Sequence, residues 1–226
     1  MASQPPHHSA NEPERDLLRR IGRKVRKRLE ANRSAKRVAV DNAELWTIQR
    51  FFDPVECGRL MSIIDTVARP STVHDYDSSR IRTSYSGDVD VRDPFIRALQ
   101  RRIDALLGIE PSHGETIQGQ RYLPGQEFKP HTDWFWPGSP AWEREWPNGG
   151  QRSFTAMAYL NEVEAGGETH FPELGIAVRP RAGMLLVWNN ADLDGAPNQR
   201  MVHAGMPVAR GVKYIITKWY RCGRWY

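Results

Sequence analysis

The feature that most limits the fold of this chain is a series of short β-forming stretches in its second half. The stretches that are apolar, or that alternate apolar and polar side chains, are residues 116–122, 152–161, 175–180, 183–189 and 212–220. Glycine turns separate them, at Pro124-Gly125, Gly149-Gly150, Gly166-Gly167 and Ala182-Gly183. Regular short strands joined by such turns predict two β-sheets. The 226 residues are enough for one domain with a sizeable core.

Helix-start signals stand upstream of this β region. Asp53-Pro54 and Asp93-Pro94 each place a capping carboxylate before a proline at the first helical position. The first helix should run to about Ala68, and Gly108 should end the second. Residues 46–52 are expected to form a first strand. The sequence therefore predicts an α+β fold, mainly β, in which N-terminal helices flank the sheets.

The connection between the two helices covers residues 70–92 and is rich in Ser, Asp and Arg. It is too long for an idle connection in a compact domain. One interpretation is a lid that becomes ordered over a substrate, and the other is a disordered loop. The residues alone favour neither.

Two candidate metal ligands, His131 and Asp133, lie two positions apart. Residues two apart in a strand point to the same face, so this imidazole and this carboxylate can reach one ion. A third ligand from a neighbouring strand would complete a two-histidine, one-carboxylate site, which suits non-haem Fe(II) and leaves coordination positions open. His203 is the expected third ligand, and His170 is its rival.

A lysine stands at the beginning of the last predicted strand, residues 212–220. Strand periodicity places on one face Lys213, Ile215, Thr217 and Trp219. Lys218 falls on the opposite face. A lysine with apolar inward neighbours needs an anion as its partner. If 2-oxoglutarate chelates the metal, its far carboxylate needs a buried cation, and Lys213 can supply one.

The run from Gln120 to Trp219 resembles the prolyl 4-hydroxylase-like Fe(II)/2-oxoglutarate dioxygenases. The blocks that carry the resemblance are Arg121-Tyr122-x-Pro124-Gly125-Gln126, His131-x-Asp133, Gly150-Gln151-Arg152-x-x-Thr155-x-x-x-Tyr159-Leu160-Asn161, Gly166-Gly167-Glu168-Thr169-x-Phe171-Pro172 and His203-Ala204-Gly205-x-Pro207-Val208-x-x-Gly211-x-Lys213. The resemblance implies that the two sheets form a double-stranded β-helix, or jelly roll. It also favours His203 over His170, because Lys213 follows His203 at the offset typical of the family.

The function that the resemblance implies is Fe(II)- and 2-oxoglutarate-dependent hydroxylation of a polypeptide residue, with proline expected, and release of succinate and CO₂. The expected cofactors are Fe(II), 2-oxoglutarate and O₂, with ascorbate as a reductant. His131, Asp133 and His203 would be the metal ligands and the catalytic centre.

Further site residues are expected around this centre. Tyr122 and Thr155 match family positions that help to bind 2-oxoglutarate, and Trp219, on the face of Lys213, would form a wall of its pocket. The residues expected to contact the substrate are Arg82, Tyr85, Trp134 and Arg152. Arg82-Thr83-Ser84 resembles the family's substrate-covering loop. Four tryptophans between residues 134 and 146 depart from the family pattern and could either form an aromatic groove for an extended peptide or close one mouth of the barrel.

Three other functions each fit part of the sequence. The same chemistry could act on a free amino acid, a small metabolite or an alkylated nucleic-acid base. A zinc hydrolase could use the same three ligands with water, but that reading gives Lys213 no role. A non-enzymatic binding module could find nucleic acid through its basic segment.

The positive charge is concentrated in residues 1–40. This leader holds 11 Lys and Arg against 4 Asp and Glu, a balance of +7, whereas residues 41–226 carry 21 against 23. Apolar residues at helical spacing predict a basic amphipathic helix within a partly disordered leader, followed by a dioxygenase domain over residues 41–226. Such a helix could contact nucleic acid, an anionic membrane surface or an acidic partner, or pack on its own domain. Two cysteines and the lack of an apolar run of spanning length favour a cytoplasmic protein without a membrane span.

Overall fold

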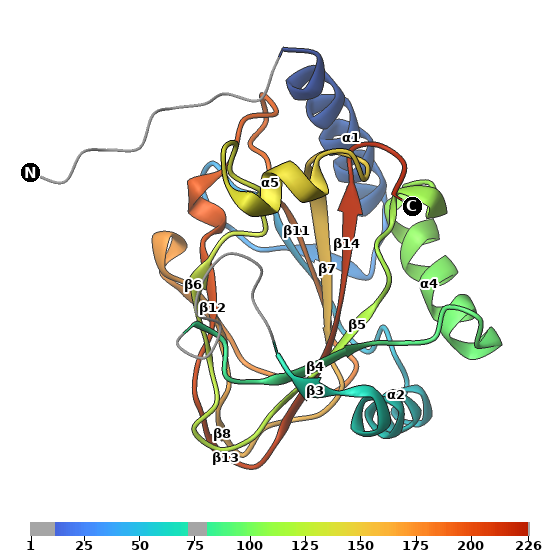
Figure 1. Cartoon of the computed structure of the whole chain (residues 1–226), viewed down its shortest axis with the longest axis vertical. Helices are drawn as coiled ribbons and strands as arrows, with labels where there is room; N and C mark the ends of the chain where they lie inside the picture. Colours follow the sequence, from blue (N-terminus) through green and yellow to red (C-terminus); the bar gives the residue numbers. More distant parts are fainter. Residues whose placement is uncertain (1–11, 72–80, 226) are drawn as a thin grey trace, which may run out of the picture.

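The computed structural model describes residues 12–71 and 81–225, which form two antiparallel sheets with helices on one side (Figure 1). In spatial order, the large sheet consists of β1 (Ala35–Arg37), β2 (Leu45–Ile48), β11 (Leu185–Asn189), β7 (Arg152–Tyr159), β14 (Lys213–Arg221), β5 (Gln118–Tyr122), β4 (Tyr85–Asp88) and β3 (Arg69–Pro70). The second sheet consists of β10 (Ile176–Val178), β9 (Thr169–Phe171), β12 (His203–Gly205) and β6 (Phe128–His131). A separate pair is formed by β13 (Val208–Arg210) and β8 (Ala165–Gly166).

The longer helices cover the outer face of the large sheet. They are α1 (Glu12–Ala31), α2 (Pro54–Val67) and α4 (Pro94–Leu107). A short helix, α5 (Pro140–Glu145), stands apart from them at the end of the barrel (Figure 1). Single 3₁₀ turns occur at η1 (Pro111–His113), η2 (Pro172–Leu174) and η3 (Gln199–Met201). No helix in the described ranges is both long and apolar enough to cross a membrane.

The helix ends follow the predicted local chemistry. The Asp53 carboxylate accepts a hydrogen bond from the Glu56 amide, and the Glu56 side chain accepts one from the Asp53 amide, so the start of α2 is a complete capping box. The Asp93 carboxylate caps α4 by accepting a hydrogen bond from the Phe95 amide, and Gly108 ends the helix in the left-handed region at φ 67°. The predicted helices and the first strand are therefore confirmed to within a few residues.

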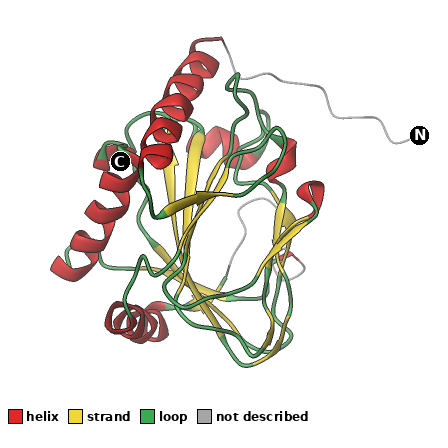
Figure 2. Cartoon of the chain, turned by 180° about the vertical axis from the view of Figure 1, so that it is seen from behind, coloured by secondary structure: helices red, strands yellow, loops and turns green. Residues whose placement is uncertain are grey.

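Two apolar layers hold the sheets in place. The outer layer lies between the helices and the large sheet, and its members include Val25, Leu29, Ile64, Ile96, Phe154, Val187 and Ile216. The inner layer lies between the two sheets, and its members include Tyr122, Met157, Tyr159, Phe171, Leu186 and Trp188. Figure 2 shows the sheets from behind, facing each other with the helices outside. The inner layer fills one end of this barrel and leaves the other end for polar residues.

The helix expected in the basic leader is α1, and its apolar stripe is buried. Leu18, Val25 and Leu29 are at most 1% exposed, whereas Arg20 and Lys24 face solvent. Arg28 donates hydrogen bonds to the carbonyl groups of Ala105 and Leu106 at the end of α4. The helix thus packs on the sheet and shares the core of the domain. Residues 1–11 of the expected disordered leader lie outside the described residues.

The connection over residues 70–92 is only partly described, since residues 72–80 of the expected lid lie outside the described ranges. Its described end forms β4, which pairs with β5. Here one substrate expectation is wrong. The Tyr85 ring packs against the outer, helix-facing core and under the Arg121 guanidinium at 5.1 Å, so it faces away from the space between the sheets.

Candidate active site

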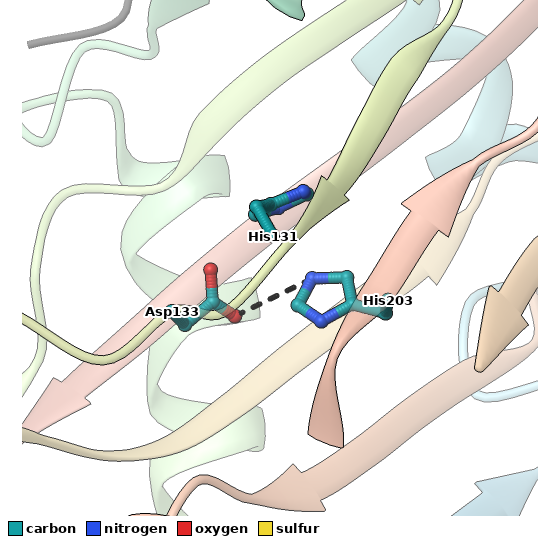
Figure 3. A group of neighbouring side chains, drawn as sticks. All are labelled: His131, Asp133 and His203. Carbon is teal, nitrogen blue, oxygen red and sulfur yellow. Dashed lines mark ion pairs between the residues drawn. The ribbon is translucent and has the colours of Figure 1, made fainter. Parts of the chain in front are cut away.

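The three predicted metal ligands converge at the open end of the barrel (Figure 3). His131 ends β6, Asp133 follows two residues later, and His203 begins β12 directly opposite His131 in the strand pairing. Their ligand atoms all lie within 4.8 Å of one another, and His203 Nε2 is 3.8 Å from Asp133 Oδ2. His170 pairs with Ala204 on the neighbouring strand and is not part of this group. The spacing of these residues in the sequence therefore predicted correctly which strand ends bring them together.

Hydrogen bonds orient both imidazoles for metal binding. His131 Nδ1 lies 2.8 Å from the Lys129 carbonyl oxygen, and His203 Nδ1 lies 2.9 Å from the Met201 carbonyl oxygen. A carbonyl can only accept, so each Nδ1 carries the proton and each Nε2 keeps its lone pair. This backbone support of the second ring nitrogen is typical of metal-binding histidines.

The protonation states also fit a metal ion. Burial, with the nearby His203, lowers the pKa of His131 to about 3, so its imidazole is neutral at physiological pH. Burial alone would raise the pKa of Asp133, but His203, Arg152 and the Thr155 hydrogen bond hold it below its usual value. Two imidazoles and one carboxylate form the donor set of non-haem Fe(II) sites. The residues present therefore fit the expected iron.

A pocket extends from these ligands between the sheets. Its wall includes the three ligands and Gln120, Tyr122, Phe128, Met157, Thr169, Trp188, Lys213, Ile215, Thr217 and Trp219. All four residues predicted to share the inner face of β14 thus line one cavity. The strand periodicity was sufficient to identify this wall.

Lys213 is the buried cation of the pocket. It is 2% exposed, and its Nζ stands 5.1 Å from the centre of the Tyr122 ring and 5.6 Å from that of Tyr159. Burial lowers its pKa to about 7, an effect that Glu168 only partly offsets. Within residues 12–71 and 81–225, no carboxylate forms an ion pair with this amine. An anionic ligand in the pocket would supply the missing charge.

Tyr122 belongs to a chain of polar groups that runs across the pocket wall. Its hydroxyl donates to Gln120 Oε1 at 2.9 Å, and Gln120 Nε2 donates to the Thr217 hydroxyl at 3.0 Å. Thr169, which also lines the pocket, accepts a 2.6 Å hydrogen bond from the Tyr159 hydroxyl. Gln120 and Thr169 were not predicted as site residues, although each lies two positions from an inward-facing residue of its own strand.

Thr155 has a different neighbour from the one expected. It is fully buried on β7, and its hydroxyl donates to Asp133 Oδ2 at 2.7 Å. It does not line the pocket beside Lys213. The predicted contact between Thr155 and 2-oxoglutarate is therefore wrong: the side chain faces inward as expected, but the metal-binding carboxylate occupies its hydroxyl.

Arg152 is held inside an ion-pair network. It donates to both Glu115 oxygens at 2.7 Å, and its guanidinium lies between the rings of Trp219, at 4.1 Å, and Phe135, at 4.7 Å. Arg221 lies on Phe135, at 4.6 Å, and also binds Glu115. Two nitrogens of the Arg152 guanidinium thus bind Glu115, and its face packs on Trp219 of the pocket wall.

The tryptophan loop does not form the continuous aromatic groove that was expected. Trp134 is 6% exposed and packs with Leu18 of α1, so its predicted contact with substrate is wrong. Trp142 and Trp146 stack on each other, with ring centres 4.3 Å apart. Trp136 is the exposed member of the four, at 39%, and its indole N–H donates to the Thr132 hydroxyl beside the metal ligands.

Arg82, which was expected to contact the substrate, lies close to the metal ligands. It is 7% exposed, and it donates to the Ser84 hydroxyl at 2.9 Å and to Gln118 Oε1 at 3.0 Å. Its guanidinium stands 5.0 Å from the centre of the Phe128 ring, which stacks on His131 at 3.6 Å. Arg82 is therefore linked to a metal ligand through one aromatic ring.

Comparison with known proteins identifies the family. Residues 117–221 match the model of the 2OG-Fe(II) oxygenase superfamily. A probable prolyl 4-hydroxylase 3 from Arabidopsis thaliana is 34% identical over 201 residues, which cover 77% of this chain and 68% of the relative. The chain thus spans about two thirds of the length of such plant relatives.

Solved structures give the same result for the fold. The viral collagen prolyl hydroxylase of Paramecium Bursaria Chlorella virus-1, in its 2OG complex, superposes with a TM-score of 0.61 at 25% identity, covering 80% of this chain and 98% of that one. A Trichoplax adhaerens prolyl hydroxylase, in complex with a hypoxia inducible factor peptide, has a TM-score of 0.62 at 17% identity, covering 91% of both chains. These matches confirm the predicted jelly roll. This chain belongs to the prolyl 4-hydroxylase-like family of 2OG-Fe(II) oxygenases, which act with Fe(II), 2-oxoglutarate and O₂.

Proposed function

We propose that this protein hydroxylates proline residues within a polypeptide. The observation that carries the proposal is the pocket that joins a two-histidine, one-carboxylate site to an unpaired buried lysine, Lys213, in a chain 34% identical to a probable prolyl 4-hydroxylase. Hydroxylation would be coupled to the oxidative decarboxylation of 2-oxoglutarate to succinate and CO₂. The iron, when bound, would supply the redox chemistry of this reaction. Ascorbate is proposed as an external reductant.

The chain's own residues would bind and orient the reactants. His131, Asp133 and His203 would hold the iron, and Lys213 would pair with the far carboxylate of 2-oxoglutarate. The Thr169 hydroxyl lies in the pocket wall at 2.6 Å from the Tyr159 hydroxyl, which also contacts the Val178 carbonyl oxygen, so Thr169 would contribute as a polar group of fixed position. Tyr122 would contribute as a side wall, because its hydroxyl proton is directed at Gln120.

Substrate would enter on the side of the ligands that carries Arg82 and Trp136. Arg82 offers a cation beside His131, and Trp136 offers an exposed ring on which a pyrrolidine ring could stack. Arg152 would act indirectly, by holding Trp219 against the pocket. The peptide bound in the Trichoplax structure favours a polypeptide over a free amino acid or small metabolite as the substrate class.

The experiment uses proline-containing extended peptides with Fe(II), 2-oxoglutarate and O₂. A peptide with proline in an extended context should gain one oxygen atom by mass spectrometry, and succinate should be released in step with it. The same peptide with alanine in place of proline should not change, and His203→Ala should form no product. If free proline is hydroxylated efficiently while every proline peptide remains unmodified, the substrate is a small molecule.

We also propose that the exposed basic face of α1 binds an anionic partner. Arg20, Arg23, Lys24 and Lys27 all face solvent on one side of the helix, while its apolar side is buried in the core. That burial favours electrostatic contact over insertion into a lipid surface. Reversing the charge of Lys24 and Lys27 should weaken binding to double-stranded DNA, more at low salt than at high salt, whereas reversing the distant Arg179 should not. Binding of an acidic peptide, and not of DNA, would assign the partner to proteins.

A further inference from the structure

We propose that Asn190 is a positioning residue for the metal site, because it fixes the hydroxyl of Thr155 and, through it, the carboxylate of Asp133. Asn190 Nδ2 donates to Thr155 Oγ1 at 3.0 Å, and Thr155 Oγ1 donates to Asp133 Oδ2 at 2.7 Å. The inference depends on the metal centre and is independent of which substrate is hydroxylated.

Because this chain of hydrogen bonds is buried, the loss of one of its members should be costly. Thr155 is fully buried, Asn190 is 3% exposed and Asp133 is 6% exposed, so water cannot easily replace a missing partner. The three residues come from different parts of the chain: Thr155 lies within β7, Asn190 directly follows β11, and Asp133 lies two residues beyond the end of β6. The relay therefore ties the large sheet to the strand end that carries a metal ligand.

The direction of each hydrogen bond follows from the chemistry of the groups. A carboxylate only accepts, so Thr155 must spend its single hydroxyl proton on Asp133. The group that faces the remaining lone pairs of the Thr155 oxygen must then be a donor, which assigns the amide nitrogen of Asn190 to that position. With the amide in place, the hydroxyl cannot turn its proton elsewhere without losing both bonds.

The backbone holds Asn190 in register. Its amide N–H donates to the Ser153 carbonyl oxygen at 2.8 Å, and its carbonyl accepts from the Asn198 amide at 3.1 Å. These two hydrogen bonds fix the backbone of Asn190 beside Ser153, which lies two residues from Thr155 on β7. A rigid support of this kind keeps the Asp133 oxygens in one orientation, so the carboxylate does not need to be ordered when the metal binds.

The neighbouring residue provides a matched control. Asn189 is 2% exposed, and its Nδ2 donates to Glu44 Oε2 at 2.8 Å, a carboxylate that also binds Arg26 of α1. It is therefore a buried asparagine of the same chemistry, next to Asn190 in sequence, and its side chain bonds to Glu44 and Ala191 and not to a metal ligand. Replacing either amide should cost stability, but replacing Asn190 alone should change metal binding.

The experiment measures the dissociation constants of Fe(II) and Co(II) by anaerobic equilibrium dialysis, together with the melting temperature of the metal-free protein. Thr155→Val should weaken metal binding about 10–100-fold, the range for loss of a hydrogen-bond partner of a ligand, and Asn190→Ala about tenfold. Thr155→Ser, which keeps the hydroxyl, should bind metal like the unmodified protein. Asn189→Ala should lower the melting temperature and leave both metal constants unchanged.

A double variant tests whether Asn190 acts through Thr155. In the Thr155→Val background, Asn190→Ala should cause no further loss of metal affinity, and the Co(II) visible spectrum should be altered to the same form in all three variants. Asn190→Leu, of similar volume, replaces Asn190→Ala if the latter does not fold. The proposal would be overturned if Thr155→Val had the same metal dissociation constants as the unmodified protein. It would also be overturned if the Asn190 and Asn189 variants had equal metal dissociation constants. Because no substrate is present, these results are independent of whether proline is hydroxylated.

Discussion

Binding of 2-oxoglutarate should weaken as the pH rises through 7, because its buried partner loses a proton. The pKa of Lys213 is lowered to about 7 by burial, whereas both carboxylates of 2-oxoglutarate remain ionised above pH 6. The anion binds the protonated amine, so the bound form has the higher pKa and takes up a proton when the pH exceeds about 7. Affinity is therefore at its full value below this pKa and is lost above it.

The magnitude follows from the protonated fraction of Lys213. With a pKa of about 7, roughly three quarters of the amine is charged at pH 6.5 and only about 3% at pH 8.5, so the apparent dissociation constant should rise about 25-fold. That ratio corresponds to about 1.9 kcal/mol. His131, with a pKa of about 3, does not titrate in this range.

The assay is an anaerobic titration of the Fe(II) protein with 2-oxoglutarate, followed by the visible charge-transfer band, at constant ionic strength. Lys213→Arg serves as the control, because a guanidinium stays charged throughout and should give a flat pH profile even if its overall affinity differs. An unmodified protein whose 2-oxoglutarate affinity is constant between pH 6.5 and 8.5 would refute the reasoning.

Three further outcomes are expected. Lys213→Ala should weaken 2-oxoglutarate binding by at least about tenfold, the equivalent of one charged hydrogen bond, whereas Lys218→Ala should leave it unchanged and instead lower the melting temperature, since Lys218 is a buried ion-pair partner of Asp104 at 3.2 Å. His203→Ala should lose iron in a metal assay and His170→Ala should keep it; the reverse result would exchange their roles. Leu29→Ala on α1 should cost about 2–5 kcal/mol in urea unfolding, because its side chain is fully buried; a loss below about 0.5 kcal/mol would mean that α1 does not pack as described.

The parts of the site that sequence could predict depend on local periodicity. His131 and Asp133 share a face because they are two residues apart, and Lys213 and Trp219 share one because they lie an even number of positions apart on one strand. The helix start at Asp53 was also predictable from local sequence, since a capping box is complete within four residues.

The parts that failed depend on contacts between distant segments. Periodicity placed Thr155 on the inner face, but only the fold brings Asp133 to its hydroxyl. Trp134 directly follows Asp133, and its burial depends on packing with Leu18 of α1, far upstream. Likewise, Lys218 was correctly assigned to the outer face of β14, yet α4 covers that face and places Asp104 against it.

The position of β14 in the large sheet has a consequence for the order in which the molecule can form. It follows every other strand in sequence, yet it lies between β7 and β5 and pairs with both. Until residues 213–221 have left the ribosome, the large sheet can exist only as two separate parts, β1-β2-β11-β7 and β5-β4-β3, each with an open edge. The final strand joins them and at the same moment delivers Lys213 and Trp219 to the pocket. During synthesis, closure of the sheet and creation of the co-substrate site are therefore a single event.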